Sequence, residues 1–143
     1  MDLTKRFPRS PRERLVGIAM LARTIDKARA YLAGTLGEYI FDCPMDKQLF
    51  AALGVDERQF AGAVRDTQTD ADVLAHLRAV SAFPHGAALE THNRAIDAWA
   101  PKSDEGRRRF EQQRGVIAPG RTDILTWTDL IEVEEGRLAR QPG

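Results

Sequence analysis

The residues best suited to chemistry lie early in the chain, between Arg23 and Tyr39. Successive helical residues are about 100° apart, so a helix through this run places Arg23, Asp26 and Lys27 on one face. Glu38 and Tyr39 follow shortly after. If they fold back over that face, two cations, two carboxylates and a phenol share one partly buried pocket. Such a pocket is suited to a small anionic or polar ligand.

Two alternatives stay open for this face. On a solvated helix, such ion pairs contribute only about 0.3 to 0.5 kcal/mol each. On a covered helix, the same charges form a site for binding a small ligand or a protein partner. A small enzyme for an anionic metabolite is the alternative function, with Tyr39 or Lys27 as general acid or base beside Asp26 and with Arg12 or Arg23 anchoring the substrate. The sequence identifies no catalytic residue.

The elements that must position these residues are helices. Apolar residues recur at helical spacing through residues 15–32. Before them, Ser10–Glu13 supplies a hydroxyl cap, a proline for the first helical position and a carboxylate that closes a capping box. The pattern predicts a helix that begins there and ends at Gly34, a residue suited to the left-handed position after a helix. Gly17 and the Arg23-Thr24 pair could divide this helix in two.

Helix starts of similar kind recur along the chain. The paired capping residues are Asp56 with Gln59, Thr69 with Asp72, and Thr126 with Asp129. Breaks between helices are expected at Pro84, Pro101 and Pro119. We therefore predict an all-α fold, a compact bundle-like array of about six to seven short helices with one short extended segment near residues 36–41.

Length and composition favour a single helical domain over residues 1–143, with residues 1–9 as an extended N-terminal arm and residues 137–143 as a frayed tail. The 21 basic and 21 acidic side chains give a formal net charge of zero, so the chain as a whole does not attract nucleic acid or an anionic membrane. No apolar run approaches the roughly 18 residues of a membrane span. A single cysteine and no leader-like start predict a cytoplasmic location.

Metal and nucleophile chemistry have weak support. The histidines His76, His85 and His92 form no His-Glu-x-x-His motif. His92 falls on an apolar stripe and is predicted to be a core or boundary residue, and His85 a loop residue near a helix start. Cys43 stands beside Asp42, which raises a thiol pKa, so we predict a buried or half-buried cysteine rather than a nucleophile. No metal and no cofactor are predicted.

Two basic clusters occur, at residues 5–14 and 107–114. Neither carries the aromatic platforms of single-strand binders, and the second is interleaved with carboxylates, so nucleic-acid binding is not expected. The acidic run Glu132 to Glu135 could pair with a basic cluster of a second copy, which would give a homodimer.

Several runs resemble a known family. They are Leu3-Thr4-Lys5-Arg6, Ser10-Pro11-Arg12, "RTIDKARAYLAGTLGEY" and "CPMD". They are similar to a family of small, mostly bacterial proteins labelled domain of unknown function 5069. The similarity covers residues 2–46, and "DLIEVEEGR" at 129–137 resembles the usual end of these proteins, whereas residues 47–125 agree only in helical rhythm.

That family has no assigned activity, cofactor or catalytic residue, so the resemblance transfers no chemistry. It implies a pattern that members keep, made of Arg12, Arg23, Asp26, Lys27, Arg29, Gly34, Gly37 and Tyr39. This pattern favours a shared polar site over a solvated face. The predicted ligand-binding residues are accordingly Arg12, Arg23, Asp26, Lys27, Arg29, Glu38 and Tyr39.

Overall fold

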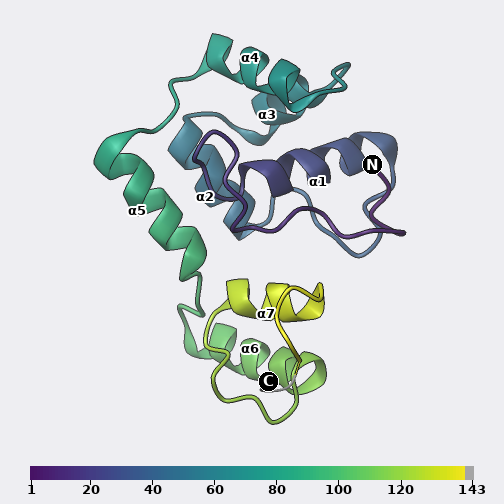
Figure 1. Ribbon diagram of the computed structural model, residues 1–143, viewed down its shortest axis with the longest axis vertical. Coiled ribbons are helices and arrows are strands. Elements are labelled where there is room, and N and C mark those ends of the chain that lie inside the picture. Colours follow the sequence, from purple (N-terminus) through teal and green to yellow (C-terminus); the bar gives the residue numbers. More distant parts are fainter. Residues whose placement is uncertain (141–143) are drawn as a thin grey trace. The chain divides into compact units, whose positions relative to one another are not determined.

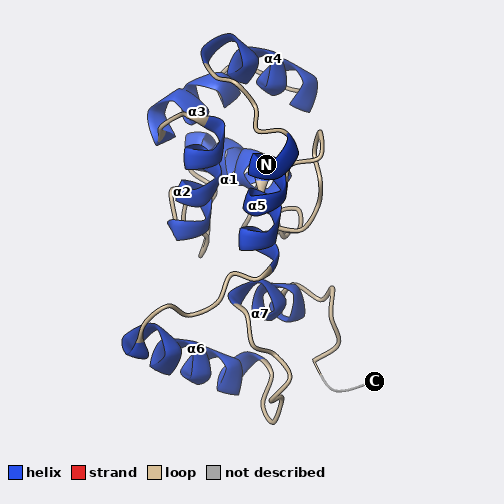
Figure 2. Cartoon of the chain, turned by 90° about the vertical axis from the view of Figure 1, so that its left-hand side faces the viewer, coloured by secondary structure: helices blue, strands red, loops and turns tan. Residues whose placement is uncertain are grey.

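The computed structural model describes residues 1–140, and these residues form seven helices and no strand (Figures 1 and 2). The predicted all-α class is confirmed. The helices are α1 (Leu21–Ala33), α2 (Pro44–Leu53), α3 (Glu57–Val64), α4 (Asp70–Val80), α5 (Gly86–Asp97), α6 (Asp104–Ile117) and α7 (Trp127–Glu134).

The chain divides into two compact units, Met1–Ile96 and Asp97–Gly143. The first unit carries α1 to α5, and the second carries α6 and α7. The single domain expected from the length stays a prediction.

Helix α1 is the centre of the first unit: α3 packs against it, and α2 and α4 both pack against α3 (Figures 1 and 2). Its apolar stripe is fully enclosed, with Leu21, Ile25 and Ala28 each 0% exposed. The polar face is enclosed as well, so that nine of its 13 residues are buried. An amphipathic pattern predicts only the apolar half of this burial.

The start of α1 differs from the prediction. Residues 11–20 form turns with an isolated bridge between Leu15 and Ile18, and the helix begins at Leu21. The backbone N–H of Met20 donates to the Pro11 carbonyl at 2.8 Å, which closes residues 11–20 into a loop. Gly17 at φ 80° permits the sharp turn. These contacts between distant residues stabilise the loop more than the capping residues at 10–13 stabilise a helix. The predicted helix end at Gly34 is confirmed, because Gly34 has a left-handed φ of 71°.

The other predicted helix starts are confirmed. Asp56, Thr69 and Thr126 each accept a hydrogen bond from the backbone three residues on. The segment from 36 to 41, predicted to be extended, is a loop with a turn at Gly37 and Glu38. No helix in residues 1–140 is long and apolar enough to cross a membrane.

The second unit has its own small core. The edge of the Phe110 ring meets the Trp127 ring at a centroid distance of 5.0 Å. Around them pack Ala118, Ile124, Leu130 and Val133. The predicted frayed tail covers residues 137–143, of which 141–143 lie outside the described residues. Arg137 and Arg140 form hydrogen bonds with Glu132 and with the Ile117 carbonyl, both within the second unit.

Candidate functional site

The first buried charge on α1 is Lys27, which is 3% exposed. Its Nζ lies 2.7 Å from Asp46 Oδ2 on α2 and 3.3 Å from the Cys43 sulfur. Asp46 also accepts hydrogen bonds from the Thr24 hydroxyl at 2.7 Å and from the backbone N–H groups of Asp42 and Cys43. This carboxylate therefore has a full set of donors, which is what makes a completely buried ion pair tolerable.

The second buried charge is Asp26, whose partner is Arg9 from the segment before α1. Arg9 donates to Asp26 from its backbone N–H at 2.9 Å and from Nε and Nη2, each at 3.1 Å. The same guanidinium forms a second bidentate pair with Asp70 at the start of α4, at 2.7 and 3.1 Å. Arg9 thus joins three separate segments of the chain through two forked ion pairs.

This geometry perturbs the titration of the Arg9 cluster. The hydrogen bond from Arg9 lowers the pKa of Asp70, and hydrogen bonds to Asp70 and Asp26 raise the pKa of Arg9. Both shifts favour the charged forms of Arg9 and Asp70.

Tyr39 lies against one residue of the charged face, Arg23. The Arg23 guanidinium, 4% exposed, lies 5.5 Å from the centre of the Tyr39 ring and donates to the Arg9 carbonyl at 3.3 Å. Glu38, by contrast, is exposed to solvent in the turn that it forms with Gly37. Arg12 is half-buried in the loop before α1.

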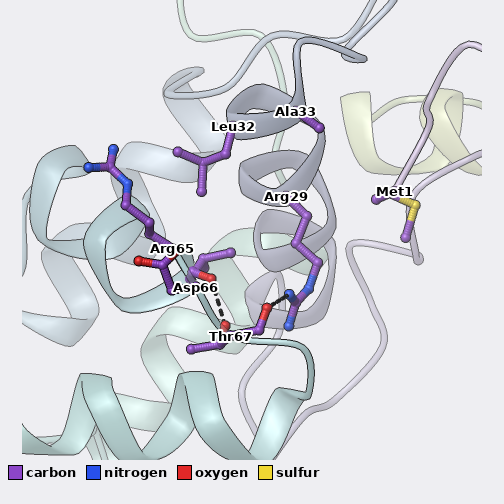
Figure 3. Close-up of a pocket in the computed structure, with 8 residues that line it drawn as sticks. Met1, Arg29, Leu32, Ala33, Arg65, Asp66 and Thr67 are labelled. Atoms are coloured by element: carbon purple, nitrogen blue, oxygen red, sulfur yellow. Dashed lines mark hydrogen bonds between the residues drawn. The ribbon is translucent and has the colours of Figure 1, made fainter.

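Arg29 lies in a different environment from the other charges of α1. With Leu32 and Ala33 it lines a hollow of about 550 Å³ whose opposite wall is the segment Val64–Thr67 (Figure 3). Its Nη1 donates to the Thr67 carbonyl at 2.8 Å. Its Nη2 is shielded from solvent, and it is the one buried side-chain nitrogen or oxygen in residues 1–140 without a hydrogen-bond partner.

The backbone opposite Arg29 includes a residue in the left-handed conformation. Asp66 has a φ of 61°, in the left-handed region that non-glycine residues rarely occupy.

The structure agrees with the predicted burial of His92, loop position of His85 and half-burial of Cys43. His92 is 2% exposed, and its Nε2 lies 2.9 Å from the Ala19 carbonyl. Burial lowers the pKa of His92, so the ring is neutral at pH 7. His85 precedes α5, and Cys43 is a half-buried residue at the start of α2. Within residues 1–140 no three His, Cys, Asp or Glu side chains are grouped as metal ligands.

Sequence reasoning missed the partners of the buried charges. Arg9, Asp46 and Asp70 are separated from their partners by 17, 19 and 61 residues. No local pattern connects positions so far apart. The sequence analysis treated Arg9 only as part of the basic cluster at residues 5–14. The left-handed turn at Asp66 also has no sequence motif.

The comparisons with known proteins agree with the resemblance seen in the sequence. A family model described as a domain of unknown function (DUF5069) matches residues 5–137. The match therefore includes the middle of the chain, where the similarity first noted was only one of helical rhythm. No curated protein matches the chain.

Proposed function

The chain belongs to the DUF5069 family, and we propose that it is a binding module for a small anionic ligand, held in the hollow beside Arg29. The observation that carries the proposal is that Arg29 lines this hollow while its Nη2, buried just behind the surface, has no hydrogen-bond partner. A buried donor of a charged group without an acceptor costs roughly 1 to 3 kcal/mol or more. A carboxylate or phosphate oxygen recovers that energy if the Arg29 side chain turns its Nη2 toward the hollow as the ligand binds.

The volume of the hollow supports the same proposal. About 550 Å³ falls within the range of roughly 300 to 1,000 Å³ that small-molecule sites occupy. Arg65 also lines the hollow, but its guanidinium is directed away from Arg29, so Arg29 is the cation that would bind the anion (Figure 3). Asp66 also lines it, which favours a ligand with a hydrogen-bond donor next to its anionic group.

The other charges predicted for this site contribute indirectly. Asp26 and Lys27 are already neutralised by Arg9 and Asp46. They hold α1 in place, and through α1 they position Arg29. The alternative of an enzyme with Lys27 as acid or base has less support, because its ammonium is bound to a carboxylate and enclosed.

The experiment is a titration with inorganic phosphate, ribose 5-phosphate and AMP, followed by amide NMR. We expect at least one of these probes to shift the resonances of Arg29, Leu32 and Thr67. Arg29→Met should reduce the affinity at least tenfold, since it removes the guanidinium and keeps the length of the side chain. Arg94→Met, at an exposed position on α5, is the matched control and should leave the affinity unchanged.

Two results would overturn the proposal. One is that none of the three anions shifts these resonances. The other is that binding persists at full strength in Arg29→Met. A cytoplasmic location, the absence of nucleic-acid binding and a homodimer stay predictions from the sequence.

A further inference from the structure

The second unit contains a hollow of about 420 Å³, which lies within the range of roughly 300 to 1,000 Å³ for small-molecule sites. One wall is α6. The other walls are the segment before α6, at Ala100 and Pro101, and the loop after it, at Thr122 and Leu125. The basic cluster at residues 107–114, for which the proposed function gives no role, supplies two of the lining side chains. The hollow therefore brings part of that cluster together with apolar residues.

Contacts within the second unit fix these walls relative to one another. The Trp127 backbone N–H donates to the Trp99 carbonyl at 2.7 Å, which holds the segment before α6. Arg114 Nη1 donates to the Ile124 carbonyl at 2.8 Å, which holds the loop after α6. The Phe110 ring, between Trp127 and the Arg114 guanidinium, is 4% exposed. A ligand loses less affinity to ordering when the walls of its site are fixed before it binds.

The charges that line the hollow come from one face of α6. Arg107 and Arg114 are seven residues apart, which is about two helical turns, or roughly 10 Å along the axis. Glu111 lies between them in the sequence and also lines the hollow. The lining therefore carries one positive charge in excess. A singly charged carboxylate suits this balance better than a phosphate dianion, which Glu111 would repel more strongly.

The two arginines differ in how available they are to an anion. Arg114 is half-buried, and the Ile124 carbonyl already holds it. Arg107 is exposed, and its side chain forms no hydrogen bond or ion pair with any of residues 1–140. Its donors are therefore available to an incoming carboxylate, which a guanidinium binds through two parallel hydrogen bonds.

Most of the remaining lining is apolar. It consists of Ala100, Pro101, Phe110 and Leu125, together with the hydroxyl-bearing Thr122. Leu125 is 65% exposed, so a ligand that covers its side chain removes apolar surface from water. The hollow thus offers apolar surface on the same site as an available guanidinium.

We infer that this hollow binds a small carboxylate with an apolar body, such as a short fatty acid. The Arg107 guanidinium binds the carboxylate, and Pro101 and Leu125 contact the apolar chain. This site goes beyond the proposed function, because the hollow shares no lining residue with the one beside Arg29 and takes a different class of anion.

The test is a titration of the full chain with hexanoate, hexanamide and acetate, followed by amide NMR. Hexanamide has the same chain without the charge, and acetate has the charge without the chain. Hexanoate should shift the resonances of Arg107 and Leu125 and bind at least fivefold more tightly than either of the others, since each lacks one of the two interactions. No shift with hexanoate overturns the inference, and so does an equal affinity for hexanoate and either of the other probes.

Two variants change the charge of the lining in opposite directions. Arg107→Met should weaken hexanoate about fivefold and leave hexanamide unchanged. Glu111→Gln should strengthen hexanoate about threefold, because it removes a repulsion. Arg108→Met and Glu105→Gln are the matched controls at exposed positions of α6 outside the lining, and each should change the affinity by less than about twofold. Hexanoate binding that responds to neither Arg107→Met nor Glu111→Gln overturns the inference.

A third variant tests the apolar contact. Leu125→Ala should weaken hexanoate and hexanamide by the same factor, about threefold, and leave acetate unchanged. Val116→Ala is the matched control, because Val116 is 79% exposed on α6 and does not line the hollow. An equal loss in Val116→Ala would mean that hexanoate binds to exposed apolar side chains in general, which overturns the inference. Arg29→Met should leave hexanoate binding unchanged, so each of the two sites stands or fails by its own probes.

Discussion

Two regions of the first unit use charge in opposite ways. The buried charges of Asp26 and Lys27 each meet a charge of the other sign at 2.7 to 3.1 Å. Around Arg29, one guanidinium nitrogen has no acceptor, and the side chain lines a hollow instead of a packed interface. Both regions lie on the same helix, within one turn of each other.

The difference teaches which charges hold the fold and which are available for a ligand. A charge with a full set of partners gains nothing from a ligand, since binding would break existing bonds. A charge with an unused donor gains directly. The number of partners, and not burial or sequence position, separates the structural region from the candidate binding region.

The largest effect is expected at Asp46. Asp46→Ala leaves the Lys27 ammonium buried without a counter-charge and removes the acceptor of Thr24. Breaking a buried pair on one side costs about 3 to 5 kcal/mol. Urea unfolding followed by circular dichroism measures this loss. Glu90→Ala, at an exposed position on α5, is the control and should change the free energy of unfolding by less than about 0.5 kcal/mol.

A loss in Asp46→Ala no greater than in the Glu90→Ala control would mean that the Lys27–Asp46 pair does not hold α2 against α1. The region around Asp26 and Lys27 could then no longer be described as the one that stabilises the fold.

A smaller loss is expected at Asp26. Asp26→Ala removes one carboxylate from Arg9, but Arg9 keeps Asp70 and its side chain is 30% exposed. Loss of hydrogen bonds to a charged group costs about 2 kcal/mol in such a setting. The same urea experiment applies, with Asp72→Ala as control, since the Asp72 carboxylate lies exposed in the first turn of α4. A cost equal to that of Asp46→Ala would show that Asp70 does not compensate.

The Arg9 cluster also predicts a dependence of stability on pH. The pKa of Asp70 is lowered in the folded protein from an ordinary value of 3.8, so the unfolded chain takes up its proton first as the pH falls. The stability that Asp70 contributes is present above about pH 4 and is lost below it. Asp70→Asn should show a flatter decline of the unfolding free energy between pH 4.5 and 2.5, roughly the window in which this carboxyl titrates.

The comparison of Asp70→Asn with the wild type isolates this carboxyl, because Asp123 keeps its own lowered pKa of about 2 in both proteins. Parallel pH profiles for the two proteins would mean that Arg9 does not stabilise the ionised form of Asp70.

The smallest effect on stability is expected at Arg29. Arg29→Met removes one hydrogen bond to the Thr67 carbonyl and also removes the unpartnered nitrogen, so the two terms nearly cancel. The free energy of unfolding should change by less than about 1 kcal/mol. Thermal unfolding without ligand measures it, next to Arg94→Met. A loss of about 2 kcal/mol or more would mean that Arg29 stabilises the fold, and the two regions would then not differ in the role of their charges.

Local chemistry accounts for the parts of the fold that the sequence predicted correctly. Asp56, Thr69 and Thr126 cap their helices because a side-chain oxygen reaches a backbone N–H only three residues away. Gly34 ends α1 because a left-handed residue is needed there. The same local logic failed at Ser10, where the Met20 to Pro11 hydrogen bond and the contacts of Ala19 with Asn93 and His92 hold a loop.

The candidate site was predictable only in part, for the same reason. Helical spacing placed Arg23, Asp26 and Lys27 on one face, and the structure encloses that face. The spacing could not supply the partners, which come from other segments, and it gave no sign that Arg29 would be the charge left with an unused donor.

The sequence by itself determined the helical class and most of the helix ends, because these depend on contacts among residues a few positions apart. It also determined the family, which is recognised from the order of residues along the chain. Only the tertiary structure decided which charges are neutralised. Ion pairing depends on distances in space between residues as far apart in the chain as Arg9 and Asp70, and no local pattern encodes such distances.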